Sequence, residues 1–284
     1  MKATGTLRRL TAFSDDASGG NPAGVWIGDL LPDVAEMQRI AAEVGYSETA
    51  FIAPSTGSVR DVRYFSPLAE VSFCGHATIA TGVALGHEQG AGDYQLNSSV
   101  GVIDVHVDTN DGRASATLTS VEPRFKAASP ELLASAVEVL GWNAADLDPS
   151  ITPAVAYAGA WHLVLAVSQL ERLNSLDYDF EKLKALMLSN DLTTLQLVWR
   201  ASKHLFHSRN PFPVGGVVED PATGAAAAAL GGYLRDSGLM TAPFHFEIRQ
   251  GEAMGRPSIL FVDVPAAGGI AVSGTATNIL ESTE

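Results

Sequence analysis

Short runs rich in β-branched and aromatic residues recur along the 284-residue chain, with Gly, Asn and Asp clusters between them. Such runs predict β-strands, because branched and ring side chains pack well on a pleated sheet and the clusters favour turns. The Asp-Thr-Asn-Asp-Gly cluster at 108–112 is a strong hairpin signal. The predicted strands are residues 7–13, 23–27, 49–52, 59–65, 100–107, 113–118, 154–157, 162–167, 195–200, 244–249 and 259–264.

Three segments show the spacing of a helix that buries one face. In the first, apolar residues recur at i, i+3, i+4 and i+7 from Met37 to Val44, and Gly45 follows as a C-cap residue. The second ends on Gly141 in the same manner, and the third begins with acidic residues that suit the positive end of a helix dipole. These predicted helices are residues 32–44, 130–140 and 179–188.

Two further predicted helices begin near Gly75 and Pro221. They are rich in Ala and Gly and almost free of charge. Because a helix that is apolar on all sides is normally surrounded by protein, we expect each to be the central helix of its own domain.

An internal repeat connects these two helices. An offset of 146 residues aligns the Arg-Tyr-Phe-Ser-Pro segment at 63–67 with the Arg-Asn-Pro-Phe-Pro segment at 209–213. Since the offset is close to half the chain length, it predicts two similarly folded halves, residues 1–122 and 123–284, with a cleft between them. The same offset pairs Val71 with Val217, Cys74 with Asp220, Ala80 with Ala226 and Gly86 with Gly232.

The composition narrows the class of protein. Hydrophobic residues make up 46% of the chain, enough for a packed core. The 18 Lys and Arg residues stand against 32 Asp and Glu residues, for a formal net charge of −14. This acidic balance argues against binding to nucleic acid or to an anionic membrane surface. A few cationic groups in a cleft would still suffice for a small anionic substrate.

The single cysteine, Cys74, excludes an intrachain disulfide and any metal site built from several cysteines. The N-terminal residues lack the apolar stretch of a signal peptide. The most apolar internal segment, residues 154–167, falls short of the roughly 20 residues that a membrane span needs. We therefore expect a soluble cytoplasmic protein.

The acidic segment from Glu219 to Gly224 is the first candidate for chemistry. Asp220 as N-cap and Pro221 as first helical residue would make a well-formed helix start without any functional role. A helix start does not by itself require Thr223 and Gly224 at the positions that follow. A glycine here lets a carboxylate or phosphate approach the exposed N–H groups, so the segment also predicts an anion site.

The segment Cys74-Gly75-His76-Ala77-Thr78 occupies the equivalent place in the first half. A lone cysteine is usually a small core residue, but the N-terminus of a helix would stabilise its thiolate. His76 at the same terminus could donate to a substrate carboxylate or carry protons.

Glu48 stands where an apolar strand is predicted to begin. A glutamate at such a position ordinarily faces solvent. If it faces the cleft between the halves instead, it is suited to proton transfer. The chain contains no dinucleotide-binding, P-loop, nucleophile-elbow or zinc-protease motif, and a strand context would point His204 and His207 to opposite faces. We therefore expect neither a metal nor a cofactor.

Taken together, these segments resemble the PhzF-like (phenazine biosynthesis) family of the diaminopimelate epimerase fold. They occur in family order and span nearly the whole chain, although residues 120–200 match loosely. The matching stretches are residues 13–25 with Gly20-Asn21-Pro22-Ala23-Gly24, Ser47-Glu48-Thr49-Ala50-Phe51, residues 63–67, Phe73-Cys74-Gly75-His76-Ala77-Thr78, Glu219-Asp220-Pro221-Ala222-Thr223-Gly224, and Gln250-Gly251 through Gly255-Arg256-Pro257.

The resemblance implies two pseudo-symmetric α+β halves, each a β-barrel-like sheet around a central helix, with the active site between them. It also implies that the C-terminal segment 270–284 joins the first half, and that the protein is a homodimer. By the same resemblance Glu48 is the general acid/base and His76 and Asp220 are its polar partners. The substrate-binding residues it implies are Cys74, Gly75, Ala77, Thr223, Gly224 and Ala225.

Ala225 departs from the family pattern, which has a serine directly after Asp-Pro-x-Thr-Gly. The departure removes a hydroxyl from the ligand site and puts the family's best-known substrate, a dihydro-hydroxyanthranilate, in doubt. The related epimerases use two cysteines as acid and base. Because the repeat sets Cys74 against Asp220, a two-thiol racemase is excluded.

The resulting hypothesis is a cofactor-independent isomerase in which Glu48 moves a proton on a small carboxylate-bearing metabolite. One alternative is a hydrolase or transferase in which Cys74 is the nucleophile and His76 its base, although residues two apart at a helix start seldom converge on one atom. The other is a non-catalytic binder of small carboxylates, which the change at Ala225 motivates.

Overall fold

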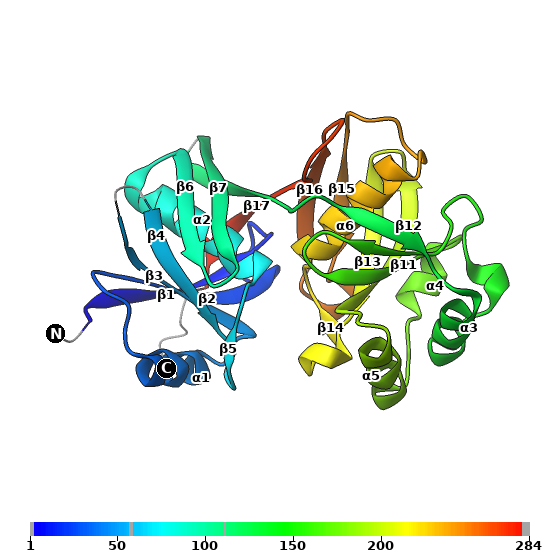
Figure 1. Cartoon of the computed structure of the whole chain (residues 1–284), viewed down its shortest axis with the longest axis horizontal. Helices are drawn as coiled ribbons and strands as arrows, with labels where there is room; N and C mark the ends of the chain where they lie inside the picture. Colours follow the sequence, from blue (N-terminus) through cyan, green and yellow to red (C-terminus); the bar gives the residue numbers. More distant parts are fainter. Residues whose placement is uncertain (1–2, 57–58, 111, 280–284) are drawn as a thin grey trace. The chain divides into compact units, whose positions relative to one another are not determined.

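The computed structural model describes residues 3–56, 59–110 and 112–279, and the chain divides into two compact units (Figure 1). The first unit runs to Thr119 and includes the chain from Ser273 onward, and the second unit is Ser120–Val272. Both combine a β-sheet with helices, so the α+β class expected from the sequence is confirmed.

The first unit is a closed barrel of eight strands in its described residues. β2 pairs in parallel with β3 and β4 in parallel with β6, while β1–β2, β3–β4, β6–β7 and β7–β8 are antiparallel. β17, from the end of the chain, pairs with both β8 and β1 and closes the circle. The strands are β1 (Gly5–Ala12), β2 (Asn21–Gly28), β3 (Glu48–Pro54), β4 (Val59–Phe65), β6 (Gly92–Ser98), β7 (Gly101–Asn110), β8 (Arg113–Thr119) and β17 (Ala271–Asn278).

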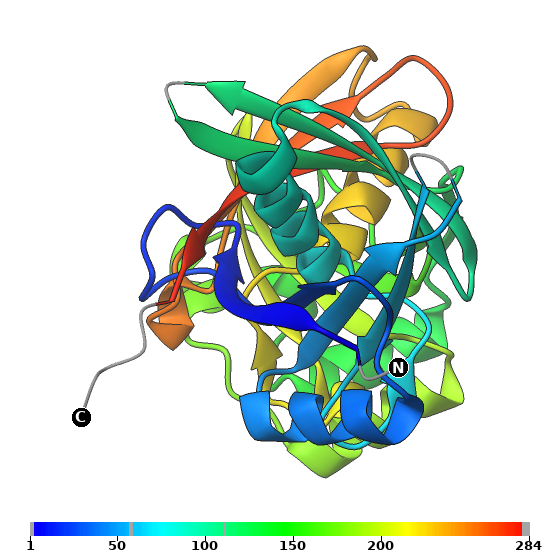
Figure 2. The same ribbon diagram turned by 90° about the vertical axis from the view of Figure 1, so that its left-hand side faces the viewer.

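The central helix of this barrel is α2 (Gly75–Gln89), which contacts strands on several sides, among them β1, β2, β3, β7 and β8 (Figure 2). Its residues from His76 to Gly86 are buried. Gly82 faces the β7–β8 hairpin so closely that a Cβ there would lie 2.7 Å from Ala116 Cβ and 2.8 Å from Val105 Cγ1. The helix is apolar on all sides because the barrel encloses it, as the sequence predicted.

Helix α1 (Val34–Val44) packs outside the barrel. The Asp33 side chain caps it by accepting from the Glu36 N–H, and Gly45 ends it with a left-handed φ of 72°. Its buried face packs with Trp26, Phe51 and Phe65 in one apolar cluster. The chain then turns directly into β3, so this helix fixes where β3 begins.

The second unit repeats the pairing pattern of the first. β10–β11, β12–β13 and β15–β16 are antiparallel, while β11–β12 and β13–β15 are parallel, which is the order found from β1 to β7. β9 adds to β10 as a further antiparallel strand. The strands are β9 (Arg124–Ala127), β10 (Ala154–Tyr157), β11 (Trp161–Val167), β12 (Thr194–Ser202), β13 (Leu205–Pro211), β15 (Phe244–Gln250) and β16 (Ser258–Val264).

Helix α6 (Gly224–Asp236) is the central helix of the second unit and contacts β9, β10, β11, β12 and β16. A separate apolar cluster joins β11 and β12 to the helices α3 (Pro130–Val139), α4 (Leu170–Asn174) and α5 (Phe180–Ser189). Each unit thus has one central helix and an additional helical layer, and the expected barrel-like sheet around a central helix is confirmed.

All eleven predicted strands and all five predicted helices are present, with ends shifted by up to three residues. The hairpin at 108–112 is confirmed by the antiparallel pairing of Asn110 with Arg113, although residue 111 lies outside the described residues. Strands β6, β9 and β17 were not predicted, and β13 was expected only as the strand context of His204 and His207. The short strands β5 (Glu70–Val71) and β14 (Glu219–Asp220) were not predicted either.

The predicted start of the last central helix is wrong. Asp220 belongs to β14, Thr223 is the N-cap, and α6 begins at Gly224, so Asp220 is not the cap and Pro221 is not the first helical residue. The Asp220 side chain instead accepts a hydrogen bond from the Thr223 hydroxyl at 2.6 Å. The Thr223 side chain makes no capping hydrogen bond to a backbone N–H of α6.

The pairing of Cys74 with Asp220 is wrong for the same reason. Gly75 lies five positions after the glutamate that starts β5, and Gly224 lies five positions after the glutamate that starts β14. The loop 212–218 before β14 is three residues longer than the loop 66–69 before β5. Beyond these loops the repeat offset becomes 149, so Cys74 corresponds to Thr223 and His76 to Ala225.

Candidate functional site

Glu48 is the first residue of β3 and lies opposite Ala23 of the parallel strand β2. The left-handed turn at Gly45 ends α1 and leads the chain through Tyr46 and Ser47 into this strand. The Glu48 side chain is 19% exposed, so it is largely withdrawn from solvent rather than facing it as strand-edge glutamates usually do.

Cys74 and His76 come from the start of α2. Cys74 is the N-cap in an extended conformation, and both side chains are buried. The Thr78 hydroxyl donates to the Cys74 carbonyl at 2.7 Å and lies 2.7 Å from the Tyr64 hydroxyl. Burial raises the pKa of Tyr64, which therefore stays neutral and anchors this turn to β4.

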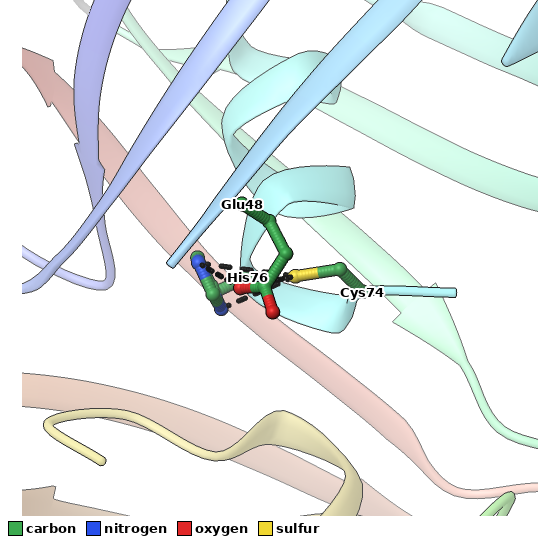
Figure 3. A group of neighbouring side chains, drawn as sticks. All are labelled: Glu48, Cys74 and His76. Atoms are coloured by element: carbon green, nitrogen blue, oxygen red, sulfur yellow. Dashed lines mark hydrogen bonds and ion pairs between the residues drawn. The ribbon is translucent and has the colours of Figure 1, made fainter. Parts of the chain in front are cut away.

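The three side chains converge on one point (Figure 3). The Cys74 thiol donates to Glu48 Oε2 at 3.4 Å, and its sulfur lies 3.4 Å from His76 Nδ1. His76 Nε2 lies 3.5 Å from Glu48 Oε2 and 3.3 Å from the Ser47 hydroxyl. Cys74 and His76 are therefore in direct contact at the start of α2, although they are only two residues apart in the chain.

A carboxylate with this environment can accept and return a proton. One oxygen of Glu48 accepts a hydrogen bond from Cys74 and lies 3.5 Å from His76 Nε2, and the side chain is partly shielded from water. These are conditions for general acid/base chemistry. In the described part of the chain, no other group of three His, Cys, Asp or Glu side chains brings its donor atoms within 4.8 Å of one another.

The second unit holds a different polar group around Asp220. The Thr223 hydroxyl donates to Asp220 Oδ2, and the Gln250 amide donates to the Asp220 carbonyl at 2.7 Å and to the Thr223 hydroxyl at 3.1 Å. Gln250 Oε1 in turn accepts from the Thr223 N–H at 3.3 Å. Gly224 and Ala225 follow as the first residues of α6. Asp220 therefore sits in a fixed hydrogen-bonded frame.

The predicted site residues thus form two groups in two units. Glu48, Cys74, Gly75, His76 and Ala77 lie together in the first, and Asp220, Thr223, Gly224 and Ala225 lie together in the second. Ser47 and Gln250 were not among the predicted site residues. Both stood in stretches that carried the family resemblance, and that was the one signal that could have found them.

An arginine–glutamate pair supports each group. Arg63 binds Glu70 through two nitrogens, at 2.7 and 2.5 Å, and this hydrogen bonding lowers the pKa of Glu70. Arg209 binds Glu219 likewise, with a closest contact of 2.6 Å, and that glutamate is almost fully buried. Two parallel N–H···O bonds fix orientation as well as distance. The first pair therefore fixes β5 against β4, and the second fixes β14 against β13. Each of these short strands leads into the central helix of its unit.

The second unit does not reproduce the ionisable group of the first. The offset of 146 that holds for β3 and β12 places Thr194 at the position of Glu48, and beyond the longer loop Thr223 and Ala225 replace Cys74 and His76. The exclusion of a two-thiol racemase still holds, because Thr223 carries no sulfur. His204 and His207 contact different partners, the His245 carbonyl and Glu252.

Among the described residues, no helix is both long enough and apolar enough to cross a membrane. The apolar segment 154–167 forms strands β10 and β11.

Comparison with known proteins gives consistent matches. The PhzC-PhzF family model, for phenazine biosynthesis-like proteins, matches residues 10–282. The uncharacterized isomerase YfhB of Bacillus subtilis (strain 168) is 31% identical over 302 aligned residues, covering 100% of this chain and 98% of that protein. The trans-2,3-dihydro-3-hydroxyanthranilate isomerase of Pseudomonas fluorescens is 30% identical over 257 residues, covering 89% of this chain and 87% of that protein.

The fold has a solved counterpart. The crystal structure of a Bacillus anthracis phenazine biosynthesis protein of the PhzF family matches with a TM-score of 0.85 and 24% sequence identity, covering 99% of this chain and 98% of that one. The PhzF-like fold expected from the sequence is therefore confirmed. On the family match and on the full-length similarity to named isomerases, the chain belongs to the PhzC-PhzF family of phenazine biosynthesis-like proteins and is an isomerase.

Proposed function

We propose that this isomerase works without a cofactor and moves a proton between carbons of a small carboxylate-bearing substrate, with Glu48 as its general acid/base. The observation that carries the proposal is the convergence of Glu48, Cys74 and His76 at the start of α2. Glu48 is the group in this cluster that can be an anionic base in one step and a neutral acid in the next.

The proton balance of the reaction closes on Glu48 alone. Its carboxylate removes a proton from a carbon next to the substrate's carboxylate or conjugated system, and the electron pair moves into that system. The protonated Glu48 then returns the proton to a different carbon. No oxidant, reductant or second substrate is needed, and the side chain ends in its starting state.

The developing negative charge would be stabilised by the start of α2. The helical hydrogen bonds begin with the Thr78 N–H, which donates to the Cys74 carbonyl at 3.0 Å. The N–H groups of Gly75, His76 and Ala77 come earlier in the helix, where no helical carbonyl is available to accept from them. Together with the positive end of the helix dipole they suit a carboxylate or enolate oxygen.

His76 and Cys74 would orient the Glu48 carboxylate. Both contact the same oxygen, Oε2, which leaves Oε1 as the atom for proton transfer. In the second unit we assign Asp220, held by Thr223 and Gln250, to binding a hydrogen-bond donor of the substrate. Ala225 offers no hydroxyl at the family's serine position, so we expect a specificity different from that of the Pseudomonas fluorescens relative.

The test is solvent deuterium incorporation across a panel of small unsaturated and amino carboxylates, read by NMR or mass spectrometry. Exchange that depends on Glu48 supports the isomerase. Saturable binding of the panel without exchange in any member would favour the non-catalytic binder instead.

The contact between Cys74 and His76 gives the thiol-dependent hydrolase or transferase a specific observation in its favour. Against it, the thiol also donates to Glu48 and is buried, which suits a positioning role better than nucleophilic attack. A Cys74→Ser variant decides between them. Measurable exchange in that variant eliminates the thiol mechanism, and complete loss of exchange with intact folding would support it.

A further inference from the structure

The same three side chains offer sulfur, nitrogen and oxygen donors in a triangle. Cys74 Sγ lies 3.4 Å from Glu48 Oε2 and 3.8 Å from His76 Nε2, and these nitrogen and oxygen atoms are 3.5 Å apart. Neighbouring ligands of a tetrahedral zinc ion are separated by about 3.3–3.8 Å, since metal–ligand distances are about 2.0–2.3 Å. The triangle therefore has the size of one face of a zinc coordination tetrahedron. Because Cys74 Sγ lies closer to His76 Nδ1, at 3.4 Å, than to Nε2, the sulfur lies beside the imidazole, and the ring must turn about its Cβ–Cγ bond to direct a nitrogen lone pair at an ion shared with Cys74.

The donor set selects among metal ions. A thiolate and an imidazole suit Zn²⁺ and its neighbours in the transition series, whereas Mg²⁺ and Ca²⁺ prefer sites built from oxygen alone. The thiolate and the carboxylate supply two negative charges, which balance a divalent cation. Cys74 and His76 are buried, while the Glu48 side chain is 19% exposed, so the cluster is not sealed from solvent. A fourth position stays open for water, as in other three-ligand zinc sites.

We propose that Glu48, Cys74 and His76 form an inhibitory binding site for Zn²⁺. Binding replaces the thiol proton by a Zn–S bond and releases that proton to solvent. The metal also takes the Glu48 carboxylate that would otherwise accept the substrate proton. The inhibitory part of this inference rests on the proposed function, whereas binding itself does not.

Binding is tested on the untagged, metal-free protein by calorimetric titration with Zn²⁺ in two buffers of different ionisation enthalpy. The expected result is one ion per chain with release of about one proton, because the thiol must deprotonate to bind. Titration with Co²⁺ should produce a thiolate-to-metal charge-transfer absorption band. Cys74→Ser should weaken zinc binding by at least about 100-fold, more than the loss of an outer-shell partner does, and should abolish the band.

His106 provides a matched control. This exposed histidine lies 2.6 Å from Asp93 and 3.5 Å from Asp108, and is a second place where an imidazole meets carboxylates. His106→Ala should leave the zinc affinity and the cobalt band unchanged. Glu48→Gln, which keeps the size of the side chain, should weaken zinc binding and so provides a second variant. Absence of one-to-one binding in the wild type, or unchanged affinity in Cys74→Ser, would overturn the site.

Activity then separates the two proposals. Zn²⁺ should stop deuterium exchange in the wild-type enzyme, and a chelator should restore it. Zinc binding through Cys74 without any exchange activity would leave the metal site standing and refute the proposed function. Exchange that proceeds unaffected with zinc bound would refute the inhibitory role and leave the isomerase intact.

Discussion

Glu48→Gln is the sharpest test of the acid/base assignment. The amide keeps the size and shape of the carboxylate but cannot take up a proton from carbon. The amide oxygen can still accept a hydrogen bond from the Cys74 thiol, which in the wild-type protein donates to Glu48 Oε2 at 3.4 Å. Removing a general base typically costs about 10²–10⁴ in rate, which corresponds to about 2.7–5.4 kcal/mol of transition-state stabilisation.

The fold should tolerate this change. At worst one hydrogen bond to a partly exposed side chain is lost, and such a loss typically costs about 0.5–1.5 kcal/mol. We therefore expect exchange to fall by at least 100-fold while the thermal midpoint moves by only a few degrees. The assay is the rate of solvent deuterium incorporation by NMR at saturating substrate, with thermal unfolding measured on the same preparation.

Glu43→Gln is the matched control for this variant. It makes the same chemical change at an exposed carboxylate on α1, where Glu43 pairs with Arg39. Its exchange rate should equal that of the wild type. An exchange rate in Glu48→Gln within about tenfold of the control would refute the reasoning, because no general base removed from a reaction leaves so small an effect.

Three further predictions concern stability. Gly82→Ala places a Cβ 2.7 Å from Ala116 Cβ, so it should lower the free energy of unfolding by about 1–3 kcal/mol in denaturant titrations, whereas Gly75→Ala in the same helix, where the nearest atom is Phe73 Cε1 at 4.0 Å, should show no such overpacking cost. Arg209→Met leaves the buried Glu219 carboxylate without its partner and should cost about 3–5 kcal/mol in the same assay, and a change below about 1 kcal/mol would contradict the structure. Burial lowers the pKa of His162 from 6.5 to about 3, so the unfolded chain takes up this proton before the folded one. Stability should therefore fall as pH drops from about 6.5 towards 3, by at most about 1.4 kcal/mol per pH unit from this group, and His162→Leu should flatten that slope.

The sequence missed three strands, β6, β9 and β17, that lack a run of large apolar residues, although it predicted other strands with one polar face, such as β7 and β16. β6 reads Gly-Asp-Tyr-Gln-Leu-Asn-Ser, and its Tyr and Leu are buried while the residues between them face outward. β9 is exposed along its whole length, and β17 alternates small and polar residues. These strands form because neighbours on the barrel supply their hydrogen bonds, and a pattern of apolar positions does not contain that information.

The register error in the repeat has an equally local cause. The loop before β14 carries the 3₁₀ turn η2 (Pro213–Gly215). Its extra residues change the repeat offset from 146 to 149 for the residues that follow. Asp220-Pro221 has the composition of a helix start, so local propensity and the equal-offset repeat agreed on the wrong boundary. Strand pairing overrides both the local propensity and the repeat. Asp220 lies opposite Asn210 in an antiparallel pair of strands and therefore does not start the helix. The correspondence between Glu48 and Thr194 is not affected, since β3 and β12 precede the loops.

The asymmetry of the two units bears on the type of reaction. A racemase that inverts a carbon centre removes a proton from one face and delivers another to the opposite face, which requires two acid/base groups. Here the first unit carries Glu48, Cys74 and His76, whereas the corresponding positions of the second unit are Thr194, Thr223 and Ala225. Neither threonine nor alanine exchanges protons near neutral pH. A single carboxylate that takes and returns the proton acts on one face of its substrate, and such a device moves a double bond or a proton along a carbon framework rather than inverting a centre. The second unit thus lacks ionisable side chains at these three positions, which is consistent with the proposed proton shift. The same difference explains why the sequence repeat is visible in the framework of Arg, Glu and Gly positions but not at these three.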